Sequence, residues 1–330
     1  MLRSPASRYI VGLLISLLTL YLALRNVAFL ELYSALRQAI PSFIIFALVS
    51  VGVNNLAKAS RWRTLLGPAG KQIAYWKIFL ALMAGQTLNA LYPARIGDLS
   101  RALVIGPAGP GRVYTLSTVV IEKLLDMVAY AALFLLLILL MPLPGWVNNS
   151  GYTLILVAVL GALGTLLVVL FPIQFTRLAD RVIRLLPDKI GKYVSDRIPY
   201  GFASLEVLQN RTGLAWLAFW SAVIWATALL NNQLTLVAMQ IQLPWVASLL
   251  LLISLQAGIS IPSIPGSIGI FEYICVLALS VFKVEQAPAL SFAIVLHMLV
   301  FIPITLFGLL SVWFLDLGIN TRGQTTGERL

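Results

Sequence analysis

Most of the chain consists of long runs of hydrophobic residues and shows no strand-like alternation of hydrophobic and polar positions. The segment AALFLLLILLM (131–141) is apolar at every position, whereas a strand of a membrane barrel alternates apolar and polar residues. One helical crossing needs about 20 apolar residues, so the charge-free runs 127–176 and 212–271 are each long enough for two crossings. The pattern predicts helices at 9–24, 40–57, 76–92, 113–142, 152–172, 213–239, 245–261, 267–282 and 287–315.

The composition excludes a water-soluble protein. Of the 330 residues, 60% are hydrophobic and only 11% are charged, and the mean hydropathy is +0.95. We therefore predict an all-α polytopic integral membrane protein, with about seven to nine helical segments in one membrane domain over residues 1–330. The basic residues behind the net charge of +11 are spread over short connections, which favours contact with anionic membrane lipids over nucleic acid.

The charges of the connections predict how the chain is oriented. Residues 177–211, inside the connection 173–212, hold seven basic and four acidic residues, whereas 142–151 and 240–245 hold no charge. An excess of Lys and Arg marks cytoplasmic connections, so we expect 173–212 to be cytoplasmic and the other two connections to be external. On the same rule we expect both termini in the cytoplasm and the protein in the inner or plasma membrane. The first apolar segment lacks a clean cleavage site, so we expect a retained first helix.

A first broken helix hairpin is predicted at 76–111. If 76–92 crossed the membrane fully, the preceding basic connection, which has no acidic residue, would lie outside, against the positive-inside rule. The conflict disappears if the chain enters from the cytoplasmic side, breaks between Pro93 and Gly97, and returns to the same side. The connection in question holds Lys58, Arg61, Arg63, Lys71 and Lys77.

A second broken hairpin is predicted at 245–282, entering from the opposite side. Pro265, Gly266 and Gly269 interrupt its apolar run, and Pro265-x-x-Ile268-Gly269 repeats the spacing of Pro93-x-x-Ile96-Gly97. Two interrupted segments in corresponding halves, opposed in direction, indicate a transporter with a binding site near the middle of the membrane, and a possible inverted repeat.

Charged residues next to the first break are candidates for binding an anion. Broken helices free backbone groups, and a helix start favours a negative charge. Arg95 and Arg101 add positive charge suited to phosphate oxygens, Asp98 could hold one arginine until the anion arrives, and Asn89 precedes the break by four residues. The alternative interpretation is an ordinary charged cytoplasmic turn with a helix N-cap.

A second group of charges lies within the apolar run 113–142. Glu122 and Asp126 are four residues apart and share a helix face, where buried like charges need a cation, a proton or an arginine between them. Arg95 or Arg101 could supply that partner. Alternatively, this part of the helix lies at the interface, with Lys123 reaching the headgroups. Arg61 and Arg63 are expected at a membrane boundary, with Trp62 as anchor.

The second half has two ionisable candidates of its own. Glu272 follows the second break, where it could accept a proton or cap the following helix. His297, the single histidine, could relay protons or make one hydrogen bond between helices. The single cysteine, Cys275, is expected to pack in the core. The polar residues inside other spans are expected to form hydrogen bonds with neighbouring helices. Those polar residues are Asn54, Asn55, Gln86, Asn231, Asn232 and Gln233.

The ordered series SRWRTLL, NALYPARIGDLSR, IEKLLDM, IPSIPGSIGIFE and a histidine in the last long helix resembles the lysylphosphatidylglycerol synthase transmembrane region, a flippase-like membrane protein family. The resemblance implies a helical membrane domain that moves lipids or lipid-linked phosphates between leaflets. Its motif positions here are Arg61, Asn89, Pro93, Arg95, Gly97, Asp98, Arg101, Glu122, Asp126, Pro265, Gly269, Glu272 and His297. Full synthases carry a soluble aminoacyl-transferase domain, and only GINTRGQTTGERL follows the last helix here, so we do not expect lysine transfer.

The leading hypothesis is a translocator of a phospholipid or a polyprenyl-phosphate-linked lipid, whose anionic head is bound by arginines in a polar cavity. The alternatives are a lipid-modifying enzyme that acts on lipid-phosphate headgroups and a non-transporting partner of such an enzyme. The sequence contains no metal-ligand cluster, nucleophile elbow, Walker loop or nucleotide fingerprint, so we expect no cofactor, no metal and no catalytic residue.

Overall fold

The computed structural model describes residues 17–24 except 19, 29–92, 96–142, 206–258 and 265–315, together with isolated positions between 160 and 174. Every regular element in these ranges is a helix, as predicted, and four helices are long and apolar enough to cross a membrane. Most of the predicted helices 9–24 and 152–172, most of the connection 173–212, and Pro93 and Arg95 lie outside the described residues.

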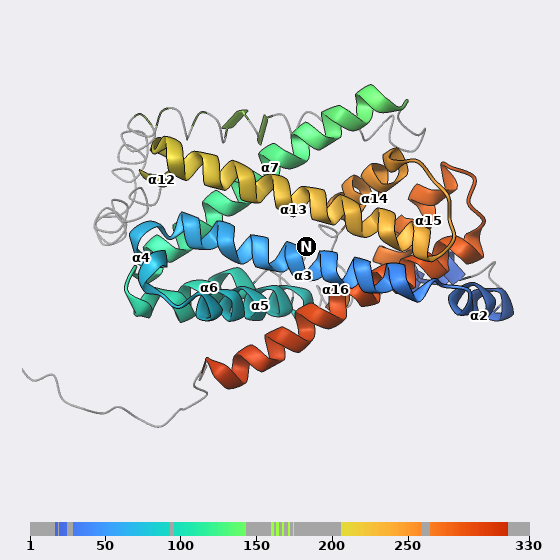
Figure 1. The fold of residues 1–330 in the computed structure, drawn as a ribbon, viewed down its shortest axis with the longest axis horizontal. Coiled ribbons are helices and arrows are strands. Elements are labelled where there is room, and N and C mark those ends of the chain that lie inside the picture. The colour runs from blue at the N-terminus through green and yellow to red at the C-terminus, as the bar shows by residue number, and fades with distance from the viewer. Residues whose placement is uncertain are drawn as a thin grey trace, which may run out of the picture.

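Apart from the additional short helix α4 in the first half, two halves of the chain repeat one order of helices: long, shorter, shorter, long (Figure 1). The first half consists of α3 (Pro41–Leu65), the short α4 (Gly67–Gln72), α5 (Tyr75–Leu91), α6 (Ile96–Ile105), the 3₁₀ turn η2 (Gly106–Ala108) and α7 (Arg112–Leu140). The second half consists of α13 (Arg211–Ala238), α14 (Trp245–Gly258), the 3₁₀ turn η3 (Pro265–Ser267), α15 (Ile270–Ser280) and α16 (Gln286–Phe314). Two short helices, α2 (Phe29–Arg37) and α12 (Glu206–Gln209), precede the halves.

The two halves meet along α3 and α13, which run antiparallel. The start of α3 lies beside the end of α13, where the Ile40 N–H donates to the Ala238 carbonyl at 2.8 Å. Further along, the Ser50 hydroxyl donates to the Thr227 carbonyl at 2.8 Å, and Asn54 donates to the Ile224 carbonyl at 2.7 Å. The matching long helices of the two halves therefore point in opposite directions, as an inverted repeat requires.

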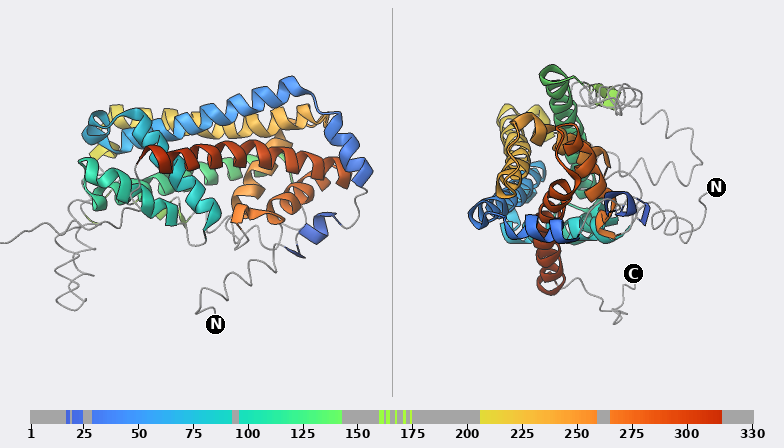
Figure 2. Two further views of the ribbon diagram at one scale, coloured as in Figure 1. Left: turned by 90° about the horizontal axis from the view of Figure 1, so that it is seen from below. Right: turned by 90° about the vertical axis from the view of Figure 1, so that its right-hand side faces the viewer.

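Helices α5 and α6 form a hairpin whose two outer ends lie at the α4 end of the bundle (Figures 1 and 2). The Tyr114 hydroxyl, in the first turn of α7, reaches the Leu66 carbonyl at 3.4 Å, so α7 also starts at that end. The two helices approach closely because they meet at glycines: a Cβ on Gly97 would overlap the Gly85 carbonyl oxygen. With 10 residues, α6 extends only about 15 Å, half of the hydrocarbon thickness.

Helices α14 and α15 form the corresponding hairpin at the opposite end of the bundle (Figure 1). They contain 14 and 11 residues, so each is also too short to cross the membrane alone. Gly266 and Gly269 adopt φ values of 77° and 88°, which L side chains rarely adopt and which explain the glycines of the predicted break. The turn η3 contacts α5, so the break of the second hairpin touches the first hairpin.

Two apolar clusters hold the halves together. One is centred on α14, α15 and α16 and includes Phe292 and the unpaired Cys275, which packs in the core as predicted. The other is built around Trp62, Leu82 and Ile105. The predicted end of the second span at residue 57 is wrong, because α3 continues to Leu65 and carries the basic segment with it.

Candidate functional site

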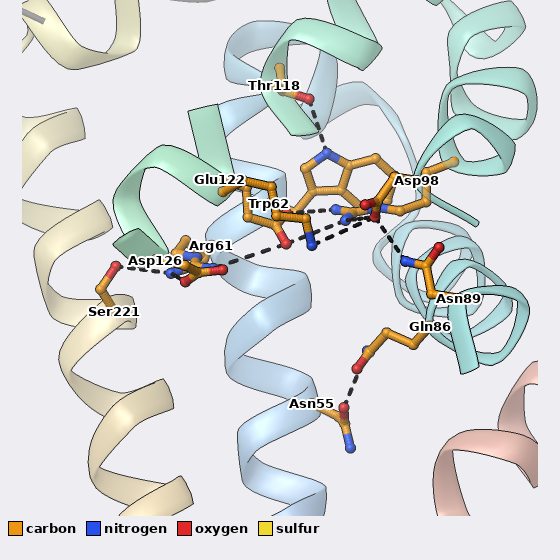
Figure 3. A network of polar contacts seen from close by, with 12 residues as sticks. Asn55, Arg61, Trp62, Gln86, Asn89, Asp98, Thr118, Glu122, Asp126 and Ser221 are labelled. Atoms are coloured by element: carbon orange, nitrogen blue, oxygen red, sulfur yellow. Dashed lines mark hydrogen bonds and ion pairs between the residues drawn. The ribbon is translucent and has the colours of Figure 1, made fainter. Parts of the chain in front are cut away.

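A buried ion pair between α6 and α7 forms the centre of the candidate site (Figure 3). The two terminal nitrogens of Arg101 donate to the two carboxylate oxygens of Glu122, at 3.3 and 2.6 Å. Both residues are almost fully buried, with exposed fractions of 2% and 5%. Arg101 is thus the partner of Glu122, one of the two arginines that the sequence offered for this role. The planar fork of arginine makes such a bidentate pair strong and directional.

A second buried arginine, Arg61 of α3, extends the pair to the next turn of α7. Its guanidinium lies 2.7 Å from the Asp126 carboxylate and 4.0 Å from that of Glu122. It also donates to the Ser221 hydroxyl of α13 at 3.2 Å. Glu122 and Asp126 face the same arginine because residues four apart share one side of a helix. Arg61 therefore connects three helices of the bundle.

Asp98 extends the network toward the first break. It lies in the first turn of α6, where a carboxylate complements the helix dipole, 3.9 Å from Arg101 and 3.6 Å from Lys123. Asn89, near the end of α5, donates to it at 3.1 Å. The predicted contact of Asp98 with an arginine is present, but the short pair of Arg101 is with Glu122.

Trp62 lies beneath this network and was not expected there. The Arg101 guanidinium lies 3.9 Å from the centre of the Trp62 ring, and the indole N–H donates to the Thr118 hydroxyl at 3.0 Å. Arg61 and Trp62 are 1% and 0% exposed, so inside the bundle they pack against protein and do not project from its surface as the expected membrane anchor would. Hydropathy placed them outside the span because charged residues lower a window average, whereas here carboxylates from α7 neutralise the charge.

The network is electrically balanced. In its ion pairs, three cations, Arg61, Arg101 and Lys123, face three carboxylates, Asp98, Glu122 and Asp126, so their formal charges sum to zero. Lys58 of α3 adds a further basic group near Asp126 and Glu122. Desolvating charges is costly, and buried ion pairs often stabilise a fold no more than apolar residues of similar size would. The Nε atoms of Arg61 and Arg101 are buried without a hydrogen-bond partner. The arrangement thus offers unused donor capacity for an anion.

Replacing Trp62 with phenylalanine is expected to lower the free energy of unfolding by about 1 kcal/mol, because one buried hydrogen bond is lost while a ring remains under Arg101. Thr118 keeps its bond to the Thr115 carbonyl, so its hydroxyl is not left unpaired. Thermal unfolding in detergent measures the change. Trp216→Phe is the matched control, since Trp216 is 50% exposed on α13. Equal shifts for both variants would contradict the role given to Trp62.

The second half holds a separate ionisable pair. Glu272, in the first turn of α15, accepts from the Gly269 N–H at 2.6 Å, so its predicted capping role is confirmed. Its other oxygen lies 2.6 Å from Nδ1 of His297 on α16, which confirms the predicted hydrogen bond between helices. The imidazole stacks on Phe271, with ring centres 4.4 Å apart. No sequence pattern linked these residues, which are 25 positions apart.

Polar residues inside the spans mainly connect helices, as predicted. Asn54 bonds α3 to α13, Gln86 reaches Asn55 at 3.4 Å, and Asn232 and Gln233 bond the carbonyls of Ser248 and Leu243. Such bonds satisfy side chains that would otherwise face hydrocarbon.

The structure brings together six of the nine sequence-predicted binding residues around α7 and pairs two others in the second half. The six are Arg61, Asn89, Asp98, Arg101, Glu122 and Asp126, and the pair is Glu272 and His297. The ninth, Arg95, lies outside the described residues. Trp62, Thr118 and Ser221 were missed. Thr118 precedes Glu122 by one helical turn and could have been found by that spacing, whereas Ser221 gives no signal in its apolar helix.

Within the described ranges, no group of three or more His, Cys, Asp or Glu residues is arranged to hold a metal ion.

Comparison with known proteins gives two matches that cover most of the chain. The sequence model of a family described as the lysylphosphatidylglycerol synthase TM region matches residues 9–308. A UPF0104 membrane protein of Pyrococcus horikoshii, PH1989, is 23% identical over 301 residues, which cover 81% of this chain and 86% of that protein.

Proposed function

Because the chain belongs to the lysylphosphatidylglycerol synthase TM region family, we propose that this membrane protein translocates a lipid with a phosphate-bearing head between the two leaflets. Residues 76–111 and 245–282 act as re-entrant hairpins that enter the bilayer from opposite faces. The basic end of the bundle, where α4 lies, faces the cytoplasm of a cell-membrane protein. The headgroup binds beside the first hairpin, and the acyl chains stay in the surrounding lipid.

The observation that carries this proposal is the buried ion-pair network beside the first broken hairpin. Two arginines are held at near-zero exposure inside an apolar bundle, each bound to a carboxylate of α7. A phosphate offers the same oxygen geometry as a carboxylate and can take its place on the guanidinium fork. Charged residues within membrane spans are costly, and they commonly mark a substrate path.

The network has a more open edge through which a headgroup can enter. The side chains of Asp126 and Lys123 are 33% and 40% exposed, whereas those of Arg61 and Arg101 are 1% and 2% exposed. An anion first meets Lys123, then replaces Asp126 or Glu122 on an arginine. The headgroup adds negative charge, so uptake of a proton elsewhere in the bundle is needed to keep the total charge unchanged as the opening of the cavity changes sides.

Reconstitution into liposomes tests the proposal. The purified protein is incorporated with fluorescently tagged phosphatidylglycerol or polyprenyl phosphate, or with tagged glucosylceramide, which has no phosphate. A membrane-impermeant reductant then quenches the outer leaflet, so the fraction quenched reports exchange. We expect full quenching of the phosphate lipids and about half quenching of the glycolipid. If about half of each tagged lipid stayed protected from the reductant, the result would contradict translocation. A lipid product with an altered headgroup would indicate an enzyme.

The double variant Arg101→Met/Glu122→Met assigns the transport to the network. Removing both partners leaves no unpaired charge between them, so the protein is expected to remain folded. Translocation should fall about tenfold or more, since at least one charge-assisted bond to the headgroup is lost. Lys71→Met, at an exposed position of α4, is the matched control and should transport at the wild-type rate. Wild-type transport by the folded double variant would exclude this site.

A further inference from the structure

Each half carries a carboxylate shortly after its break, and the two carboxylates have chemically different partners. Asp98 and Glu272 each lie in the first turn of the helix that follows a break. Asp98 is next to Arg101 and Lys123, whereas Glu272 is next to His297. Histidine is the side chain whose charge ordinarily changes near neutral pH. The second half therefore carries a histidine–carboxylate pair whose charge a proton can change.

We infer that the Glu272–His297 pair is the proton-binding site that couples translocation to a pH gradient, with one proton moved per lipid. This inference rests on the proposed function and adds its driving force. The pair lies between α15 and α16, next to the turn η3 that touches α5. It is thus adjacent to the meeting point of the two hairpins.

The geometry assigns the position of the proton. Nδ1 of His297 carries a hydrogen and donates it to Glu272, because the carboxylate oxygen 2.6 Å away is an acceptor. The added proton therefore comes from water to Nε2, and it returns to water from the same atom when the cavity opens to the other side. The pair changes from a net charge of −1 to zero, and no bond other than N–H forms or breaks.

Two aromatic rings flank the imidazole, and the other titratable or charged groups lie on the elements packed around it. Phe271 stacks on the ring, and Phe301 meets it edge-on at 5.7 Å between ring centres. Helix α14 and the turn η3 contain no charged residue, α16 contains no other ionisable side chain, and α15 adds Tyr273 and the buried thiol of Cys275. The remaining helices packed on α16 carry Glu31 and Arg37 in α2, Lys58, Arg61 and Arg63 in α3, Lys77 in α5, and Arg211 in α13.

The same carboxylate links the proton to the second break. One oxygen of Glu272 accepts a hydrogen bond from the N–H of Gly269, which precedes α15 and has a φ of 88°. The other oxygen is hydrogen-bonded to His297. Protonation of the imidazole strengthens its hydrogen bond to the Glu272 carboxylate. Because the same carboxylate also binds the Gly269 N–H, this change reaches the backbone at the break. Loss of negative charge also lowers repulsion of an anionic headgroup. Proton and lipid therefore bind together and move in the same direction.

A leaflet-distribution measurement tests this coupling. Proteoliposomes with tagged phosphatidylglycerol are given a gradient of one pH unit, with the membrane potential clamped at zero by valinomycin and potassium. One proton per lipid should produce about a tenfold excess of the lipid in the leaflet facing the alkaline side. An even distribution with rapid exchange, or an excess on the acidic side, would overturn the inference and leave translocation standing. Absence of exchange would instead refute the proposed function.

His297→Gln identifies the group responsible. Glutamine keeps a hydrogen-bond donor toward Glu272 but cannot take a proton. This variant should show no excess in either leaflet under the gradient. Lys283→Gln, which removes an exposed charge from the connection between α15 and α16, should retain the tenfold excess. A tenfold excess in His297→Gln would overturn the assignment.

A direct readout needs no transport. The chain contains one histidine, so ¹⁵N-histidine labelling with a histidine-free affinity tag gives the signals of a single imidazole. We expect Nδ1 to stay protonated in the wild type while the Nε2 signal changes on proton uptake, and Glu272→Gln to alter the Nδ1 signal. An imidazole that keeps one protonation state throughout would contradict the inference.

Discussion

Glu122→Ala is expected to lower the free energy of unfolding by about 3–5 kcal/mol, because it leaves Arg101 buried without its bidentate partner. Arg101 has an exposed fraction of 2% and cannot reach water without moving α6. Its next carboxylate, Asp98, lies 3.9 Å away and is shared with Lys123. Thermal unfolding and gel filtration in detergent measure the effect as a lower midpoint and loss of monodisperse protein.

Two comparisons make this result specific. Glu285→Ala removes an exposed carboxylate whose side chain caps nothing, and it should change stability little. Arg101→Met/Glu122→Met should recover most of the loss, since no buried charge of that pair remains. If Glu122→Ala were as mild as Glu285→Ala, the network would not be the buried unit described here.

Gly97→Ala is expected to separate α5 from α6, at a cost of about 1–3 kcal/mol and with loss of translocation. The new methyl group would overlap the Gly85 carbonyl oxygen, a backbone atom that cannot rotate away. It would also lie 2.8 Å from the Asn89 side-chain oxygen, which disturbs the bond from Asn89 to Asp98. The stability and liposome measurements above report both effects.

Gly52→Ala is the matched control for that change. Gly52 lies within α3 with nothing within 4 Å of an added Cβ, so alanine there should be neutral or stabilise the helix by up to about 1 kcal/mol. Equal behaviour of the two alanine variants would show that the contact between the hairpin helices tolerates a side chain.

Within the described residues, hydropathy and the positions of Pro and Gly were sufficient to predict the long helices and the interruptions that follow α5 and α14. An apolar run must form a helix in lipid, and a break needs residues that leave the helical backbone, so both features are local. The pattern failed at the end of α3: the predicted span stops at residue 57, but the helix continues to Leu65, with Arg61 and Trp62 buried in the bundle. Their burial depends on Glu122 and Asp126, which come from a helix about 60 positions later in the chain.

The pairing of the charges needed the tertiary structure. The shared face of Glu122 and Asp126 followed from their spacing, and an arginine partner followed from the cost of burying two carboxylates. Which arginine binds which carboxylate depends on how α3, α6 and α7 pack, and helix packing is not encoded in spacing. For the same reason the sequence offered roles for Glu272 and His297 separately but did not bring them together.

Cysteine accessibility tests the opposed entry of the two hairpins most directly. In a Cys275→Ala background, single cysteines replace Lys71, Arg112, Gln242 and Lys283, all of which are exposed, and a membrane-impermeant maleimide labels them in intact right-side-out cells. Positions 71 and 112 should both be protected until the membrane is opened, and positions 242 and 283 should both react at once. Labelling of positions 71 and 112 from different sides would show that residues 76–111 cross the membrane and would contradict the first re-entrant hairpin.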